Sequence, residues 1–173
     1  MLHVRSATIE DADGIAAVHV ASWHAFYRGL LPPEAIAGRS LELRRKQWAA
    51  SLQSPARVTL VACDDANAIA GFSSALLLEQ PDGGFASYLQ TLYLMPEAAR
   101  RGTGRRLLEA IAAELLARGI PNMALRVLRL NAARGFYERL GARLVPEGIA
   151  TDAGNFDDVV YAFDDLRVLS GAS

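Results

Sequence analysis

A chain of 173 residues with 51% apolar and 21% charged residues has the composition of a globular protein, which excludes a disordered chain. Its formal net charge of -1 excludes the broad basic field of a nucleic-acid-binding domain, so we expect no nucleic-acid partner. Cys63 is the only cysteine, which excludes an internal disulfide, and neither a signal peptide nor a membrane span is apparent. We expect a cytoplasmic protein without a membrane partner, forming one domain over residues 1–173.

The first part of the chain favours two helices. Thr8 stands three residues before Asp11, a spacing typical of a helix-capping arrangement, and apolar residues then recur at helical intervals. We predict a helix from about Asp11 to Trp23. The pair Pro32-Pro33 interrupts the pattern, and a second helix is predicted from Ser40 to Leu52.

The rest of the chain predicts a meander followed by alternating strands and helices. Strands rich in β-branched and apolar residues are expected over 57–63, 68–79, 85–95, 122–128, 142–146 and 157–163. Helices are expected over 103–118, which has a clear apolar face, and over 131–141. This order predicts an α/β fold with a mixed sheet.

The stretch "PEAARRGTGRRLLEAI" places four arginines around Gly102 and Gly104, immediately before a helix. Unpaired N–H groups at a helix start attract anions, and glycines let the backbone approach a ligand closely. An ordinary charged helix start is the alternative interpretation. Because cations at the positive end of a helix dipole are unfavourable by themselves, the pattern favours a bound anion such as a phosphate.

Two common nucleotide-binding motifs do not fit this stretch. The P-loop requires Gly-Lys-Ser/Thr at a spacing that is missing here. The dinucleotide fingerprint requires a third glycine where this chain has Leu107, and it belongs to an opening βαβ unit rather than to a meander. A nucleotide-binding oxidoreductase is therefore a weak hypothesis.

"LYLMPEAARRGTGRRLLEAIAAEL" resembles the signature strand, loop and helix of the GNAT superfamily of N-acetyltransferases. "LNAARGFYERLGARL" resembles the second conserved region of that superfamily, and the first 32 residues are similar to the start of many small members. The resemblance implies a mixed, mostly antiparallel sheet of about seven strands flanked by helices, with central strands that splay apart to admit acetyl-CoA.

The resemblance also implies the cofactor-binding residues. The pyrophosphate of acetyl-CoA is expected at the turn before the helix and the pantetheine arm along the preceding strand. The implied contacts are Leu92, Tyr93, Leu94, Arg100, Arg101, Gly102, Thr103, Gly104, Arg105 and Asn131. Ala99 departs from the family pattern, which has Gln or Arg there, and Arg100 or Arg101 is a candidate substitute.

Tyr137 is implied as the general acid that protonates the departing thiolate, because a phenol donates a proton without prior ionisation. Its spacing relative to Phe136 and Leu140 also suits a packed core face, which is the alternative role. The N–H of Leu94 is a candidate to stabilise negative charge on the thioester oxygen. Many relatives carry an acidic residue on this strand, whereas this chain has Tyr88 and Gln90.

The residues that bind the amine acceptor are less clearly indicated by the sequence. Trp23, His24, Tyr27 and Gln90 are candidate contacts for the acceptor, a primary amine of a small molecule or peptide, and His24 is a candidate base. Asp152, Asp157 and Asp158 are further candidates, with solvated loop charges as the alternative. We expect no metal site.

Two functional hypotheses remain open. The first is an acetyl-CoA-dependent N-acetyltransferase that transfers the acetyl group directly, since Cys63 lies in a predicted core strand and no acyl carrier is evident. The second is a non-catalytic acyl-CoA-binding sensor of the same fold. A homodimer is a further possibility that the resemblance allows.

Overall fold

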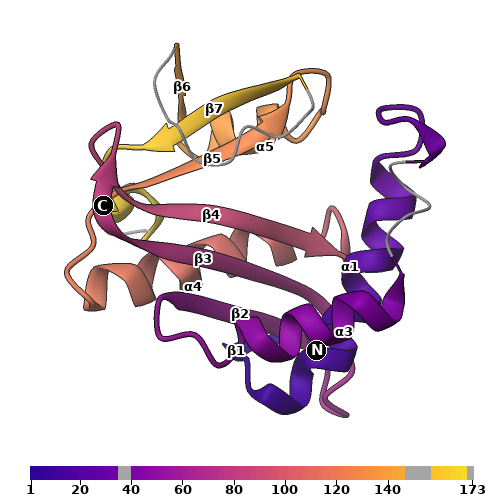
Figure 1. The fold of residues 1–173 in the computed structure, drawn as a ribbon. Coiled ribbons are helices and arrows are strands. Elements are labelled where there is room, and N and C mark those ends of the chain that lie inside the picture. The colour runs from indigo at the N-terminus through magenta and orange to yellow at the C-terminus, as the bar shows by residue number, and fades with distance from the viewer. Residues whose placement is uncertain (35–39, 147–156, 171–173) are drawn as a thin grey trace.

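Seven strands form one mixed sheet in the order β1-β2-β3-β4-β5-β7-β6 in the computed structural model, which describes residues 1–34, 40–146 and 157–170 (Figure 1). The strands are β1 His3–Ser6, β2 Arg57–Cys63, β3 Ile69–Asp82, β4 Phe85–Leu94, β5 Met123–Leu128, β6 Arg143–Val145 and β7 Asp158–Phe163. Neighbours pair antiparallel except for β4 and β5, which run parallel. The predicted mixed, mostly antiparallel sheet is confirmed.

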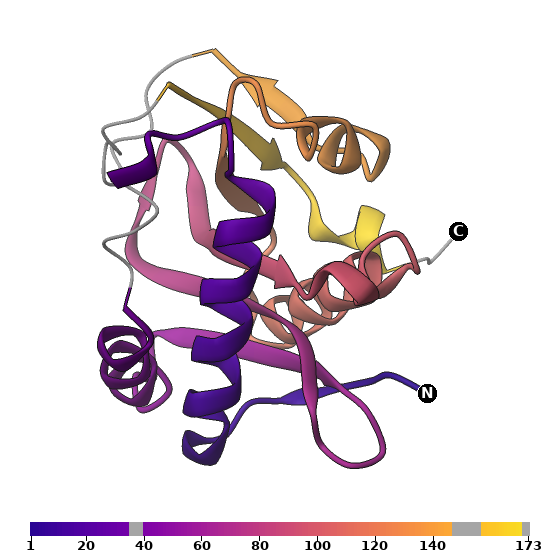
Figure 2. The same ribbon diagram turned by 90° about the vertical axis from the view of Figure 1, so that its right-hand side faces the viewer.

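Helices cover both faces of this sheet. The helices are α1 Ala12–Phe26, α3 Leu41–Ser51, α4 Thr103–Ala117 and α5 Arg134–Arg139, with short 3-10 turns at Ile9–Asp11, Pro96–Ala98 and Leu166–Leu169. Figure 1 shows α3 and α4 on opposite faces, and Figure 2 shows α1 running beside α3 on the face away from α4. One buried apolar cluster lies under α4, and a second lies under α1 and α3.

The predicted apolar stripe of α4 accounts for its position. Leu107, Leu108, Ile111 and Leu115 are fully buried against the sheet, as expected from their spacing. Gly119 follows the helix with φ +76°, a left-handed conformation that ends it.

Several element boundaries differ from the sequence prediction. β1 was not predicted as a strand, because four residues carry too little periodicity to indicate one. α1 continues to Phe26, three residues past the predicted end. The predicted helix over 131–141 is shorter: Oδ1 of Asn131 accepts the N–H of Ala133 at 2.9 Å, which forms a turn before α5 begins at Arg134.

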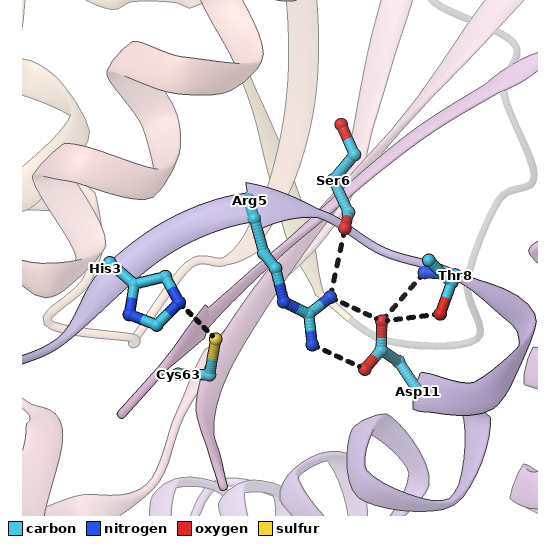
Figure 3. A network of polar contacts seen from close by, with 6 residues as sticks. All are labelled: His3, Arg5, Ser6, Thr8, Asp11 and Cys63. Atoms are coloured by element: carbon cyan, nitrogen blue, oxygen red, sulfur yellow. Dashed lines mark hydrogen bonds and ion pairs between the residues drawn. The ribbon is translucent and has the colours of Figure 1, made fainter. Parts of the chain in front are cut away.

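A polar network joins β1 to the start of α1 (Figure 3). Arg5 makes a two-pronged pair with the buried carboxylate of Asp11, at 2.8 and 2.9 Å. The same carboxylate accepts the N–H of Thr8 at 2.7 Å, so the predicted capping role of this pair is confirmed. The Arg5 guanidinium holds the pKa of Asp11 below its usual range. Beside this network, Nε2 of His3 lies 3.3 Å from the thiol of Cys63, which is buried.

β4 and β5 separate soon after they meet. They pair only at Tyr88–Ala124 and Leu89–Leu125, in the first half of each strand, and diverge towards their carboxyl ends in Figure 1. The splayed central strands implied by the resemblance are therefore confirmed. No helix among the described residues is long and apolar enough to cross a membrane. The predicted polar loop with Asp152 lies outside the described residues.

We predict that Asp11→Ala lowers the free energy of unfolding at pH 7 by about 1–2 kcal/mol, because it removes a part-buried charge-assisted pair and a cap. Since the folded-state pKa of Asp11 is depressed, its contribution is complete above the unfolded value near ~3.9 and is lost as pH falls through the lower folded value. Urea denaturation at several pH values measures both effects. Asp13→Ala, at an exposed site, is the control and is expected to stay within about 0.5 kcal/mol.

Candidate functional site

Beyond Leu89, β4 and β5 are separated by a gap in the sheet. The edge of β4 that faces this gap carries backbone groups that do not pair with β3. The N–H of Met95 donates to the carbonyl of Ala70 next to β3, at 2.8 Å. Because successive N–H groups in a strand point in opposite directions, the N–H of Leu94 points away from β3, towards the gap. The Leu94 carbonyl, on the same edge, accepts the Ser22 hydroxyl of α1 at 2.6 Å. The end of β4 therefore directs one backbone donor, the N–H of Leu94, into the gap. The Leu94 carbonyl oxygen on the same edge is hydrogen-bonded to α1.

The turn before α4 has the shape of an anion cradle. Arg100 and Gly102 both adopt positive φ, of 60° and 77°, and the first backbone bond of the helix runs from the N–H of Arg106 to the carbonyl of Gly102. No side chain of the described residues caps this end. The N–H groups of Thr103, Gly104 and Arg105 are thus left at the positive end of the helix dipole, where an anion is stabilised.

The four arginines around this turn divide into two kinds. All are exposed, but Arg105 pairs with Glu109 at 2.6 Å and Arg106 donates to the carbonyl of Leu2 at 2.9 Å. Arg100 and Arg101 form no ion pair with any described residue. Guanidinium groups without such a pair are suited to bind a phosphate, and Arg100 or Arg101 stays the predicted substitute for the family contact at Ala99.

The buried atoms of the cradle also fit a phosphate-bearing cofactor. Thr103 is 1% exposed, and its hydroxyl oxygen has no partner among the described residues. A Cβ on the buried Gly104 would stand 3.5 Å from Leu94 and 3.6 Å from Phe136, so the helix start packs directly against the end of β4 and against α5. The cradle and the β4 edge therefore form one continuous surface, along which the predicted diphosphate and pantetheine contacts lie.

Tyr137 lies in the apolar cluster under α4 and is 8% exposed. Burial raises the pKa of its phenol, and the charge of Tyr27 raises that pKa further. The Tyr137 ring packs edge-on against that of Phe136, at 5.1 Å between ring centroids. Asn131, the other residue predicted near the cofactor, is half-buried and uses its side-chain oxygen in the turn before α5.

Aromatic side chains line the α1 side of the gap. Tyr93 stacks on His19 at 4.9 Å between ring centroids and meets Trp23 and Tyr27 edge-on at 6.3 and 6.4 Å. Trp23 and Tyr27 stack on each other at 4.3 Å. The predicted acceptor residues Trp23 and Tyr27 therefore come together with the cofactor-strand residue Tyr93.

Sequence reasoning missed His19 and Ser22, and it named Thr103 as a cofactor contact without a role for its hydroxyl. His19 is 5% exposed and its Nδ1 accepts the indole N–H of Trp48 at 3.1 Å, which fixes the ring in the cluster. His19 and Ser22 share the helix face of Ile15, so the 3.6-residue period was the signal that could have found them.

Two other predicted acceptor residues lie apart from the aromatic rings. His24 is the residue after Trp23 on α1, and its side chain is exposed. It takes no part in the described ring contacts. Gln90 is exposed on β4, four residues before Leu94, and accepts a hydrogen bond from Arg57.

Known proteins share both this sequence pattern and this fold. The model of the acetyltransferase (GNAT) family matches residues 20–142. The uncharacterized N-acetyltransferase YuaI of Bacillus subtilis strain 168 is 32% identical over 171 residues, 98% of this chain and 96% of its own. The PaiA N-acetyltransferase from Thermoplasma acidophilum, solved in complex with coenzyme A, has a TM-score of 0.76 at 24% identity, over 94% of this chain and 98% of its own.

The ribosomal-protein-S18-alanine N-acetyltransferase from Escherichia coli has a TM-score of 0.65 at 24% identity, over 94% of this chain and 93% of its own. A mixed sheet with splayed central strands and an anion cradle define an acyl-CoA-dependent acyltransferase. The chain belongs to the GNAT family and is an N-acetyltransferase.

The cradle is tested by a matched pair of glycines on one helix. Gly102 and Gly119 precede and follow α4 with φ of 77° and 76°, and a Cβ on either would meet no atom within 4 Å. We expect Gly102→Ala and Gly119→Ala to cost about 1 kcal/mol each of stability through the same backbone strain. Only Gly102→Ala should weaken coenzyme A binding, about tenfold, because its methyl group enters the space beside the cradle. Calorimetric titration and urea denaturation measure the two effects, and equal affinity of both variants would contradict the assignment.

Proposed function

We propose that this N-acetyltransferase transfers the acetyl group of acetyl-CoA directly to a primary amine of a small molecule or peptide, with Tyr137 as the general acid. The observation that carries this proposal is the separation of β4 from β5 beyond Leu89, which leaves the N–H of Leu94 directed into the gap. In this proposal the proton donor Tyr137 acts at the same gap as the aromatic side chains of Trp23, Tyr27 and Tyr93.

The cradle and the β4 edge bind the cofactor in this proposal. Amides at Gly102, Thr103, Gly104 and Arg105, with the guanidinium groups of Arg100 and Arg101, hold the diphosphate. Leu92, Tyr93 and Leu94 supply the strand edge for the pantetheine arm, and Asn131 closes the other side. Acetyl-CoA supplies an activated acetyl group and a thiol leaving group.

The remaining residues orient the two substrates and protonate the departing sulfur. The N–H of Leu94 is positioned to polarise a carbonyl oxygen in the gap, where water is scarce and a hydrogen bond is strong. Because burial raises the pKa of Tyr137, its phenol keeps its proton at neutral pH and donates it to the departing sulfur. Trp23, Tyr27 and Tyr93 form the apolar wall against which the acceptor amine lies.

A non-catalytic acyl-CoA sensor is the second candidate. The observation that favours it is that β4, "FASYLQTLYL", carries no carboxylate to deprotonate an amine. Thiol release across a broad panel of primary amines separates the two candidates, since a sensor binds acetyl-CoA and releases no thiol above the rate without protein.

Tyr137→Phe is expected to lower kcat about 100-fold or more and to leave the KM for acetyl-CoA within about threefold, because it removes a proton donor without opening a cavity. Steady-state kinetics with a verified acceptor measure this. Tyr161→Phe is the control, since it removes the hydroxyl of a second buried tyrosine, which bonds to Glu138 and Arg134 instead of facing the gap. An unchanged kcat in Tyr137→Phe would remove this residue from the mechanism.

The raised pKa of Tyr137 also sets the pH profile. A general acid loses activity when it deprotonates, and an ordinary phenol does so near pH ~10. Since burial moves this pKa upward, we expect kcat to show no alkaline decline between about pH 8 and about pH 10. A decline in that range that disappears in Tyr137→Phe would show that the phenol ionises normally.

A further inference from the structure

Arg57 is a cation of β2 that has no acidic partner among the described residues. Arg57 begins β2, and its guanidinium reaches past β3 to donate from Nη1 to Oε1 of Gln90 on β4. Gln90 is a neutral amide, and Arg57 forms no ion pair with any described residue. Burial lowers the pKa of Arg57, so its charge has lost hydration without gaining a counter-charge.

Both side chains project onto the face of the sheet that carries α1 and the aromatic wall. Val58 and Leu89, their chain neighbours, are buried in the cluster under α4. Since successive strand residues point to opposite faces, Arg57 projects to the other side. Gln90 is the extra residue of a bulge in β4, between Leu89 and Thr91, and its hydrogen bond with Arg57 brings its side chain to the same side. Gln90 is exposed, so solutes reach this position.

Gln90 also marks the start of the gap. The last pair between β4 and β5 is Leu89–Leu125, so Gln90 is the first β4 residue beyond it, and Leu94 is at the other end. At about 3.3 Å per strand residue, the two positions are roughly 13 Å apart. With the pantetheine arm along the β4 edge, an acceptor that lies over the α1 face of the sheet with its amine near Leu94 therefore has its other end towards Arg57.

The other charges near Gln90 are already compensated. Arg126 follows Leu125 on β5, across the gap from Gln90, and its charge counteracts the effect of burial on the pKa of Asp158. Arg57 lines a surface pocket together with Glu114 of α4 but forms no ion pair with it or with any other described residue. With one N–H given to Gln90, its guanidinium keeps further donors in a planar fork that suits a carboxylate or a phosphate.

We propose that Arg57, oriented by Gln90, binds an anionic group of the acceptor, so that the acceptor is an extended amine with a carboxylate or phosphate on the order of 10 Å from its nucleophilic nitrogen. The inference rests on the proposed function and adds the acceptor's chemical class to it.

The test uses ω-amino carboxylates of increasing chain length, each matched with its primary amide and with the ω-aminoalkyl phosphate. In the wild-type enzyme the ratio of kcat/KM for the anion over that for the amide should rise with length and reach about tenfold. Arg57→Met, which keeps an apolar stem, should lower this ratio to about one, and Arg57→Lys should restore part of it. The carboxylate and phosphate series identify which anion the site prefers.

Arg45→Met is the matched control, because Arg45 is an exposed arginine on α3 paired with Asp13, and it should leave both activity and ratio unchanged. Calorimetric binding of the same compounds in the presence of coenzyme A gives a readout that needs no turnover. If coenzyme A binds but no amine is acetylated, the proposed acetyl transfer is wrong. The calorimetric data then still show whether Arg57 binds the anionic group. A wild-type protein without preference for the anion, or an Arg57→Met variant that keeps the preference, overturns the proposal.

Discussion

The separation of β4 from β5 is the constraint on which the site depends. Two paired positions near the start of these strands hold the sheet together, and beyond Leu89 the strands run apart. A backbone edge buried without partners is costly, so such an edge persists where a ligand supplies the missing hydrogen bonds. In this chain the split exposes one edge of β4, and the start of α4 packs against the end of that strand, since a Cβ on Gly104 would stand 3.5 Å from Leu94. The split in the sheet thus brings a strand edge and a helix start together, which is the arrangement that the proposed function uses.

The sequence predicted most of the fold because its periodic segments are long. The α4 stripe from Leu107 to Leu115 and the meander strands have enough residues to show their period, and they lie where predicted. β1 has only four residues, which are too few to show a period. α5 is shortened by a turn at Asn131, which the spacing of apolar residues does not indicate. The glycine turn at the start of α4 is also where the sequence indicated it, while its role as an anion cradle stays a prediction, drawn from glycines among arginines at a helix start.

The site residues that sequence reasoning missed act through contacts between distant segments. Ser22 is 72 positions from its partner Leu94, and His19 is 29 positions from Trp48, so neither contact leaves a mark in nearby residues. Arg57 and Gln90, 33 positions apart, meet because β2, β3 and β4 are neighbours in the sheet. Gln90 could be named from the sequence as an acceptor residue, but its relation to a cation required the strand order.

The hydrogen bond from the Ser22 hydroxyl to the Leu94 carbonyl affects which hydrogen-bonding groups the end of β4 presents to the gap. With one lone pair of its carbonyl oxygen hydrogen-bonded to α1 and its N–H directed into the gap, the last residue of β4 acts towards the gap more as a donor than as an acceptor. A carbonyl oxygen that enters the gap meets a hydrogen-bond donor at this position. One hydroxyl on a neighbouring helix thus ties α1 to the end of β4 and changes the hydrogen-bonding character of that strand edge.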